Sequence, residues 1–353
     1  MDNITLIASE KNWIDTRSVD ALKNVAKLEG VKRVVGLPDL SVGNVPNGMA
    51  VITQDYIYPH LIGGDIGCGM MLCEVKIKPK KIKVEKFAKY LSKIESLDDI
   101  DIDMPHLGFH LGSIGKGNHF AELHLVDSIK DKELFESLNL SANSLYTLVH
   151  SGSRAFGQIV FDRFVDKYEV TKGINTKDAS SYLQEHNQAL QYAKTSRMYI
   201  TQKLLKVIKI DTKANLVSDT FHNAITKIDG GWLHQKGATP TNKGAVIIAG
   251  SRGSLSYLVM PTEDTSYSNY SLAHGAGRKW ERSVAKAKLK ARYTKSDMQK
   301  TVIGSRVVCS DSNLLYEEAF EAYKDIDTVI ADLLSAKLIK VIATFKPILT
   351  YKE

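Results

Sequence analysis

Segments that favour helix and segments that favour strand alternate irregularly along this sequence, and this restricts the fold more than any other feature. Apolar residues recur at helical spacing in 84–94, 184–206 and 280–291. Short β-rich runs such as 245–248 and 255–259 are bounded by glycine and proline, as strands commonly are. Because no regular strand–helix–strand rhythm appears, a doubly wound parallel sheet is disfavoured. We therefore predict an α+β fold in which mixed and antiparallel β-sheets are surrounded by helices.

Length and composition predict one compact domain over residues 1–353. A chain of 353 residues could form two domains, but no Gly/Ser/Pro-rich linker divides it and no segment repeats at a fixed period. No apolar run reaches the roughly 18 residues that a membrane-spanning helix needs. Residues 1–10 lack the features of a secretory signal, and the three cysteines show no paired spacing. We expect a cytoplasmic protein whose net charge of +7 favours a polyanionic partner.

Asp65 and Cys68 form a D-x-x-C pair within the glycine-rich segment Gly63–Gly69. A carboxylate and a thiolate three residues apart can face one cation, and glycines remove side chains that would obstruct it. Neutral imidazoles would complete a site for borderline divalent metals, and one thiolate can serve two such ions. Histidines beside glycine, asparagine or serine, at expected ends of strands or turns, are His119, His150, His222, His234 and His274. The alternative is a buried, inert cysteine beside a turn aspartate.

Gly-Ser-Arg occurs three times, and each copy offers N–H groups, a hydroxyl and a guanidinium that suit a phosphate. The copies are Gly152–Arg154, Gly250–Arg252 and Gly304–Arg306, of which one is expected to be coincidental. We also predict that His274-Gly-Ala-Gly-Arg278 opens the basic helix that carries Trp280, because a helix N-terminus favours phosphate. A histidine there could contact phosphate, act as an acid or base, or attack phosphorus as a nucleophile. These residues alone leave the three roles open.

Seven sequence blocks, taken in order, resemble the RtcB RNA-splicing ligases. The blocks are Gly64-Asp65-Ile66-Gly67-Cys68-Gly69, Gly115-Lys116-Gly117-Asn118-His119-Phe120-Ala121-Glu122, His150-Ser151-Gly152-Ser153-Arg154, Phe221-His222-Asn223, Lys236-Gly237-Ala238-Thr239, Gly250 to Tyr257 and His274-Gly275-Ala276-Gly277-Arg278. The resemblance covers residues 30 to 353. It implies an RtcB-like domain and a GTP- and Mn²⁺-dependent ligase that joins RNA 3′-phosphate or 2′,3′-cyclic phosphate ends to 5′-hydroxyl ends.

The resemblance also implies roles for single residues. His274 would be the nucleophile that takes GMP from GTP. Two Mn²⁺ ions, one on each side of a bridging Cys68, would be held by Asp65, Cys68, His119, His150 and His222. The guanylate pocket would be lined by Asn118, His119, Phe120, Ala121, Glu122, His222, Asn223, Ala249, Gly250, Ser251, Arg252, Ser256, His274, Gly275, Ala276, Gly277 and Lys352. Glu122 would accept hydrogen bonds from the guanine edge and so exclude adenine. Manganese rests on the resemblance alone, since these ligand types prefer zinc by intrinsic affinity.

The sequence departs from the family pattern at several positions. Ser41 stands where the family has histidine, Gln235 and Pro240 stand where it has arginine, and Ala249 and Arg252 replace a proline and a methionine. We expect RNA phosphates to bind near these positions, so the departures bear on substrate choice more than on guanylylation. The chain is also similar to a shorter branch coupled to a release-factor-H-like protein, which implies RNA repair, with ribosomal RNA as a substrate.

Two other functions are compatible with the residues. The metal cluster could serve a phosphoesterase that opens cyclic phosphates without GTP. The basic helix could instead belong to a non-catalytic RNA-binding protein, for which steep salt dependence would be expected.

Overall fold

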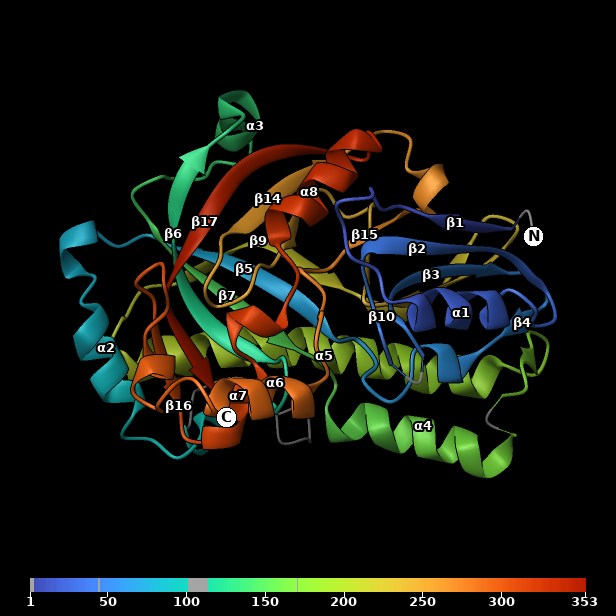
Figure 1. Ribbon diagram of the computed structural model, residues 1–353, viewed down its shortest axis with the longest axis horizontal. Helices are drawn as coiled ribbons and strands as arrows, with labels where there is room; N and C mark the ends of the chain where they lie inside the picture. The colour runs from blue at the N-terminus through green and yellow to red at the C-terminus, as the bar shows by residue number, and fades with distance from the viewer. Residues whose placement is uncertain (1–2, 44, 101–113, 170) are drawn as a thin grey trace.

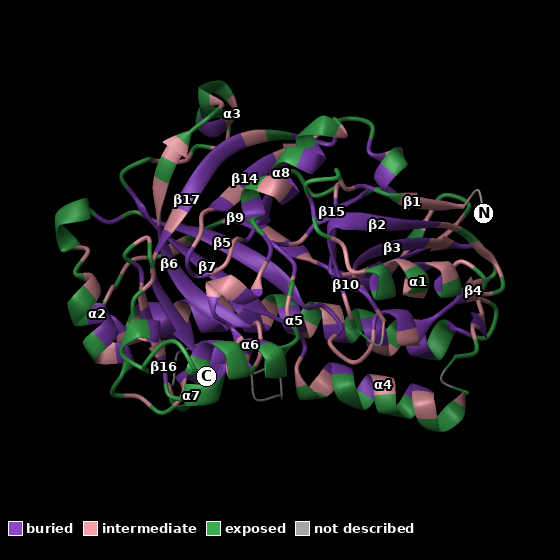
Figure 2. Ribbon diagram, viewed as in Figure 1, coloured by how far each residue is buried: buried purple, intermediate pink, exposed green. Residues whose placement is uncertain are grey.

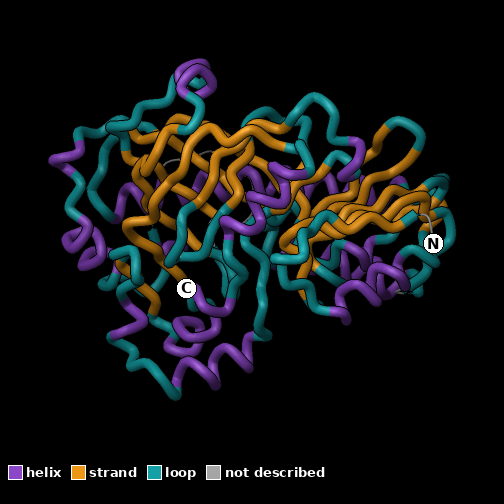
Figure 3. Tube along the Cα trace, turned by 45° about the horizontal axis from the view of Figure 1, so that its top comes forward, coloured by secondary structure: helices purple, strands orange, loops and turns teal. Residues whose placement is uncertain are grey.

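The computed structural model describes residues 3–43, 45–100, 114–169 and 171–353. Most of its strands lie in two sheets, which Figure 3 shows as two groups of strands with helices around them. The smaller sheet has five strands in the order β1 (Ile4–Leu6), β2 (Val31–Ser41), β3 (Asn47–Thr53), β11 (Gly231–Lys236) and β10 (Asn223–Ile228). Two short ribbons pair β12 (Ala238–Pro240) with β15 (Ser271–Ala273), and β4 (Tyr56–Ile57) with β8 (Ile174–Asn175).

The larger sheet has eight strands, and its central strands position the candidate site. Its order is β13 (Val246–Ile248), β14 (Ser256–Pro261), β17 (Ile339–Lys352), β6 (Phe120–Ile129), β7 (Leu145–Ser151), β5 (Gly69–Val75) and β9 (Ala214–Phe221), with β16 (Arg306–Cys309) also pairing β17. Strand pairs β16–β17 and β1–β2 are parallel, and the other pairs in the two large sheets are antiparallel. The predicted α+β class with mixed and antiparallel sheets is confirmed.

Eight α-helices of the described residues surround these sheets (Figure 1). They are α1 (Thr16–Val25), α2 (Val84–Leu91), α3 (Lys132–Ser137), α4 (Ala155–Lys167), α5 (Ser180–Val207), α6 (Arg282–Lys290), α7 (Ser312–Glu317) and α8 (Ile326–Ser335). The predicted helical stripes in 84–94 and 184–206 correspond to α2 and α5, and the runs 245–248 and 255–259 to β13 and β14. In the described part of the chain, none of the helices combines the length and apolarity needed to cross a bilayer.

Strands β5 and β7 are buried on both faces, as the purple colour of the sheet centre shows in Figure 2. Successive side chains point to opposite faces of a strand. In β7, Leu145 and Val149 therefore pack with Ile200 and Leu204 of α5. Leu148 packs on the other face with the side chains of β13, β14 and β17. Helix α5 thus covers one face of β5 and β7, and the strands β13, β14 and β17 of the same curved sheet cover the other. The ends of β6, β7, β5 and β9 lie beside one another because these strands are neighbours in the sheet.

The predicted helix after His274 begins later than expected. Gly275 bridges Ala249 and Arg278 bridges Tyr323 as isolated β-bridges, so the backbone between them is held by other segments. Helix α6 starts only at Arg282, and its buried residues are Ala285 and Leu289. The apolar repeat of Trp280, Val284, Ala287 and Ala291 therefore does not mark the buried face of this helix, and Val284 is 40% exposed. The prediction that His274 lies at a helix N-terminus is wrong.

Candidate active site

The metal-site side chains come from the ends of neighbouring strands. Cys68 directly precedes β5, His119 precedes β6, His150 lies in β7 and His222 follows β9. The strand register places Gly69 opposite both Ser151 and Phe221, and Phe120 opposite His150. Four segments far apart in sequence therefore deliver their side chains to one place because their strands are hydrogen-bonded neighbours.

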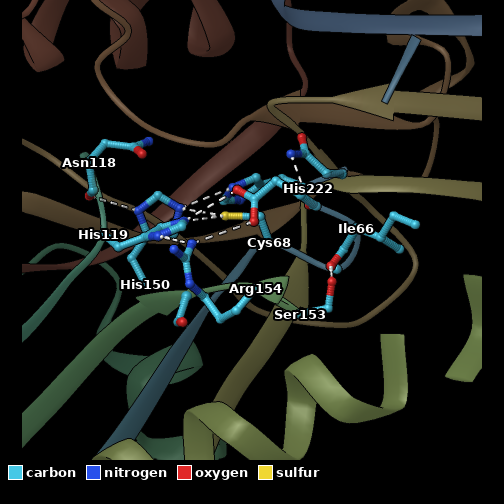
Figure 4. A network of polar contacts seen from close by, with 12 residues as sticks. Ile66, Cys68, Asn118, His119, His150, Ser153, Arg154 and His222 are labelled. Atoms are coloured by element: carbon cyan, nitrogen blue, oxygen red, sulfur yellow. Dashed lines mark hydrogen bonds and ion pairs between the residues drawn. The ribbon is translucent and has the colours of Figure 1, made fainter. Parts of the chain in front are cut away.

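The polar atoms of these side chains converge on the Cys68 sulfur (Figure 4). Cys68 Sγ lies 3.2 Å from His119 Nε2 and 3.1 Å from His150 Nε2. His150 Nε2 lies 3.2 Å from His222 Nε2, and Asp65 Oδ2 lies 3.3 Å from His119 Nε2. Two groups of ligand atoms result, Cys68–His150–His222 and Asp65–Cys68–His119, and they share the sulfur. All five metal ligands predicted from the sequence are thus brought together.

The protonation of this cluster suits a divalent metal. Burial and the neighbouring histidines lower the pKa values of His150 and His222 well below the ordinary value, so both imidazoles are neutral. Burial opposes ionisation of Asp65, but His119, Lys236 and Arg154 outweigh it and lower the pKa of its carboxyl group. Burial and Asp65 raise the pKa of the Cys68 thiol, which a bound cation would reverse by taking the thiolate as ligand. Neutral imidazoles, a carboxylate and a sulfur form a donor set that fits borderline divalent ions.

Further groups hold the ligands in place. The carbonyl oxygen of Asn118 accepts from His150 Nδ1 at 3.1 Å, as is usual behind a metal-binding imidazole. Arg154 Nη1 donates to His119 Nδ1 at 2.8 Å and so orients this ring by the opposite hydrogen-bond direction. Gly152 must lack a side chain, since a Cβ there would lie 2.5 Å from Asp65 Oδ1. Sequence reasoning placed Arg154 in a phosphate-binding tripeptide and did not foresee its contact with His119.

His274 is held by two acceptors on the same ring nitrogen. Its Nδ1 lies 2.6 Å from Asp39 Oδ2 and 2.8 Å from the carbonyl oxygen of Gly237. Because both partners can only accept, Nδ1 carries the proton and Nε2 keeps a lone pair. Among the described residues, no group hydrogen-bonds to that Nε2. The ring centroid lies 4.5 Å from that of His222, so this nitrogen base stands beside the metal cluster.

Asp39 is the main functional residue that sequence reasoning missed. It is fully buried, and its Oδ2 also accepts the backbone N–H of His274 at 3.1 Å. Lys324 Nζ donates to the carbonyl groups of Pro38 and Leu40 on either side of it. Asp39 lies in the block in which Ser41 departs from the family pattern, so that match to the family was the signal that could have found it. Lys236, whose buried ammonium lies near Asp65 and Cys68, was missed as well.

One cavity of about 680 Å³ joins His274 to the metal cluster. The predicted guanylate residues that line it are Asn118, Phe120, Glu122, His222, Asn223, Ala249, Gly250, Ser251, Arg252, His274, Gly275, Ala276, Gly277 and Lys352. Ala121 lies elsewhere, in the core with Leu123 and Leu349. Ser256 supports the wall from behind, because its hydroxyl accepts the N–H of Gly250 at 3.1 Å.

The inner end of the cavity is built around Glu122. Thr350 Oγ1 donates to its Oε1 at 2.6 Å, and His124 Nε2 lies 2.9 Å from its Oε2. Lys352 Nζ donates to the carbonyl oxygen of His119 at 2.7 Å, and burial lowers the pKa of this lysine to about 8. Arg252 donates to the carbonyl of Leu315, while its buried Nη1 has no hydrogen-bond partner among the described residues. These groups present a fixed carboxylate and two buried cations to the cavity.

Two other sequence predictions fall outside the cavity. Arg306 of the third Gly-Ser-Arg copy lies in β16 and pairs with Glu85 at 3.2 Å; of the three copies, only Gly250–Arg252 lines the cavity. His234 lies within β11 and its Nε2 accepts the backbone N–H of Tyr58 at 2.8 Å. Its expected position at the end of a strand or in a turn is wrong, because it lies inside β11, where its ring supports the backbone of Tyr58.

Comparison with known proteins gives one consistent family. The family model described as tRNA-splicing ligase RtcB matches residues 21–104 and 105–353. The RNA-splicing ligase RtcB2 of Escherichia coli is 40% identical over 100% of this chain and 96% of its own length. The tRNA-splicing ligase RtcB of Nanoarchaeum equitans is 31% identical over 99% of this chain and 93% of its own. The tRNA-splicing ligase RtcB of Archaeoglobus fulgidus is 26% identical over 95% of this chain and 91% of its own length.

Proposed function

The chain belongs to the RtcB family of RNA-splicing ligases, and from this premise we propose that it joins RNA ends through a GMP carried on His274. Its substrates are RNA with a 3′-phosphate or 2′,3′-cyclic phosphate, RNA with a 5′-hydroxyl, and GTP. The observation that carries the proposal is the His274 ring, because Asp39 and Gly237 hold its Nδ1 proton and leave Nε2 facing the cavity that contains the Cys68 cluster.

The first step is attack of His274 Nε2 on the α-phosphorus of GTP. An N–P bond forms, the bond to the bridging oxygen breaks, and pyrophosphate leaves with that electron pair. The positive charge that develops on the imidazole is stabilised by the buried carboxylate of Asp39 at 2.6 Å from Nδ1. Asp39 is thus a positioning and charge-stabilising residue, comparable in its role to the acid of a catalytic triad.

Two further displacements complete the reaction. An oxygen of the RNA 3′-phosphate attacks the GMP phosphorus, and the N–P electron pair returns to Nε2. The 5′-hydroxyl oxygen then attacks the RNA 3′-phosphorus and its proton passes to solvent. The phosphodiester bond forms as the bond from that phosphorus to the GMP oxygen breaks, and GMP leaves with that electron pair. A 2′,3′-cyclic phosphate must first be opened by water. Divalent cations held by Asp65, Cys68, His119, His150 and His222 would supply charge neutralisation for the phosphoryl groups; we take them to be two Mn²⁺ ions, as the family resemblance implies.

The guanine base would bind at the inner end of the cavity. The carboxylate of Glu122 keeps lone pairs beyond those used by Thr350 and His124, so it can accept the N–H groups that guanine has and adenine lacks. Lys352 lies in the same end of the cavity and can donate to an acceptor on the base. Adenine lacks the N–H groups that guanine would donate to the remaining lone pairs of Glu122 and would leave them desolvated, so the site would discriminate against ATP.

Incubation with α-labelled GTP and Mn²⁺ tests the proposal. We expect a covalent label on the protein that is absent in His274→Ala and kept in His234→Asn, a matched change of a buried histidine outside the cavity. A label that survives in His274→Ala would refute the nucleophile. Cyclic-phosphate opening at the same rate with and without GTP, and no ligation, would instead support the phosphoesterase.

The biological setting is part of the same proposal. The resemblance implies repair of cleaved RNA, including ribosomal RNA, in the cytoplasm and together with a release-factor-H-like protein. Ligation of ribosome-derived fragments with and without such a protein, in parallel with a tRNA half-molecule pair, tests this setting. Equal rates on both substrates and no effect of the added protein would count against it.

A further inference from the structure

Trp13 stands exposed at the outer end of the catalytic cavity. It lines the cavity together with Ser41 and Trp280, and 54% of its surface is exposed. The ring makes no aromatic or cation–π contact with any described residue. Single exposed apolar side chains are ordinary on protein surfaces, so a second observation is needed before one of them indicates a binding surface.

The backbone that carries Trp13 is fixed next to the nucleophile. The side-chain amide of the preceding residue, Asn12 Nδ2, donates to the carbonyl oxygen of Pro38 at 2.9 Å and to Asp332 Oδ2 at 2.7 Å. Pro38 is followed by Asp39, which holds His274. The hydrogen bonds of Asn12 thus anchor the chain next to Trp13 to the segment that holds the ring that would carry GMP.

The acidic groups on this rim are already neutralised. Arg17 pairs with Asp15 at 2.8 Å and with Glu281 at 3.0 Å, so its guanidinium links the Trp13 segment to the segment after His274. Arg278 and Arg282 share the buried carboxylate of Glu318. No uncompensated carboxylate among these groups would therefore repel a polyanion at the mouth.

Two lysines lie around Trp280 and form no salt bridge with any described residue; Lys279 lines the cavity, and Lys288 lies beyond its lining. Lys279 and Lys288 lie over the Trp280 ring, with Nζ 5.0 Å and 4.5 Å from its centroid. They cover that ring, so Trp13 is the tryptophan left with a free face. An exposed aromatic ring together with ammonium groups that no carboxylate neutralises is the combination with which proteins bind single-stranded nucleic acid, because bases stack while phosphates meet cations.

We propose that Trp13 stacks on a base of the RNA strand that carries the 3′-phosphate, while Lys279 and Lys288 contact its backbone. The inference rests on the proposed function and names the subsite for its first RNA substrate. We assign the 3′-phosphate strand to this subsite because GMP on His274 is transferred to that strand in the next step, before the 5′-hydroxyl strand takes part. The strand then runs from the metal cluster outward across the rim.

The test uses enzyme that has been loaded with labelled GMP and then mixed with increasing amounts of a 3′-phosphorylated oligoribonucleotide. The rate of GMP transfer to RNA is normalised to the label on the protein, so only loaded molecules are counted. For Trp13→Ala we expect the half-saturating RNA concentration to rise about 5- to 150-fold, the range that stacking of one base gives. Trp13→Phe should stay within about 3-fold of wild type, since it restores a stacking face.

Tyr267→Ala is the matched control, because Tyr267 is 53% exposed and does not line the cavity. It should leave RNA dependence unchanged. An abasic nucleotide in the 3′-phosphate strand should abolish the difference between wild type and Trp13→Ala, and one in the 5′-hydroxyl strand should not. Equal RNA dependence of wild type and Trp13→Ala, or a difference that persists with every abasic 3′-phosphate strand, would overturn the proposal.

Fluorescence anisotropy of the labelled oligoribonucleotide separates this proposal from the ligase function, because it needs no turnover. Weaker binding by Trp13→Ala without any protein labelling by GTP would support the RNA subsite and refute the nucleophile. Protein labelling with unaltered RNA binding by Trp13→Ala would refute the subsite alone.

Discussion

Replacing Asp39 by asparagine should slow formation of the GMP adduct on His274 without weakening GTP binding to the same degree. The carboxylate is fully buried and accepts two hydrogen bonds from His274, at 2.6 Å from Nδ1 and at 3.1 Å from the backbone N–H. As His274 attacks, its ring becomes cationic, and the Nδ1 contact turns into a hydrogen bond between two charges. Such a bond contributes about 1.5–3 kcal/mol. Loss of that amount in the transition state corresponds to a rate about 10- to 150-fold lower.

A second effect of the substitution acts in the same direction. The asparagine amide can turn its N–H₂ toward Nδ1 and stabilise the tautomer that has its proton on Nε2. That tautomer has no lone pair for attack on phosphorus. We therefore expect the upper part of the range, with the effect on the rate constant of labelling rather than on the GTP concentration needed for half-saturation.

Rapid-quench measurement of protein labelling by α-labelled GTP gives both quantities. Asp332→Asn is the matched control, because Asp332 is also a buried carboxylate near Lys324 and its hydrogen bonds go to Ser9 and Asn12 instead of His274. The control separates loss of a buried charge from loss of the His274 contact. Labelling by Asp39→Asn at the wild-type rate, or an equal loss in Asp332→Asn, would refute this account of the nucleophile.

Three further outcomes are expected. Cys68→Ser should lose bound metal, seen by elemental analysis after dialysis, while its unfolding midpoint stays close to that of the metal-free wild type, since a hydroxyl cannot replace a bridging thiolate. Glu122→Ala should reduce the preference for GTP over ATP by about 10-fold or more, measured as the ratio of labelling rates, because the site then lacks the carboxylate lone pairs that accept the N–H groups of guanine. Burial lowers the pKa of His186 to about 4, and its Nε2 accepts the N–H of Ile225 at 3.1 Å. The unfolded chain therefore binds more protons between pH 6.5 and 4, stability falls as the pH falls through this window, and His186→Gln should reduce that slope by up to about 1.4 kcal/mol per pH unit in urea unfolding.

Each of these outcomes has a clear contrary result. Unchanged metal content in Cys68→Ser would show that the sulfur is not a ligand. Retained nucleotide selectivity in Glu122→Ala would remove the carboxylate from base recognition. An unaltered acid slope in His186→Gln would mean that another group titrates in that range.

Patterns of neighbouring residues predicted the fold class and the helices whose apolar stripes face a core. Helix α5 is such a case, since Ala193 and Leu204 are buried as their spacing indicates. The segment after His274 was predicted incorrectly because its conformation depends on distant partners. Ala249 bridges Gly275, and Glu318 holds Arg278 and Arg282, so tertiary contacts override a local helical pattern there.

The candidate site was likewise predicted from the sequence only in part. The five ligands around Cys68 could be chosen from their residue types and from the family blocks. The contact of Asp39 with His274 could not, because it joins residues 235 positions apart and depends on how β2 packs beside β15. The salt bridges at the cavity mouth likewise join side chains that are far apart in the sequence, so no spacing pattern could predict them.

Strand β17 has a consequence for how the enzyme matures. It pairs with β6, β14 and β16, and its Thr350 and Lys352 contact residues 228 and 233 positions earlier in the chain. Pairing across such separations is slow, because the long intervening loop must be closed first. During translation this strand leaves the ribosome after every other described strand of its sheet, so a nascent chain that already carries His274 and Cys68 still lacks one wall of the cavity that they line. Under the proposed function, loading of His274 with GMP is therefore expected only after this segment has been synthesised.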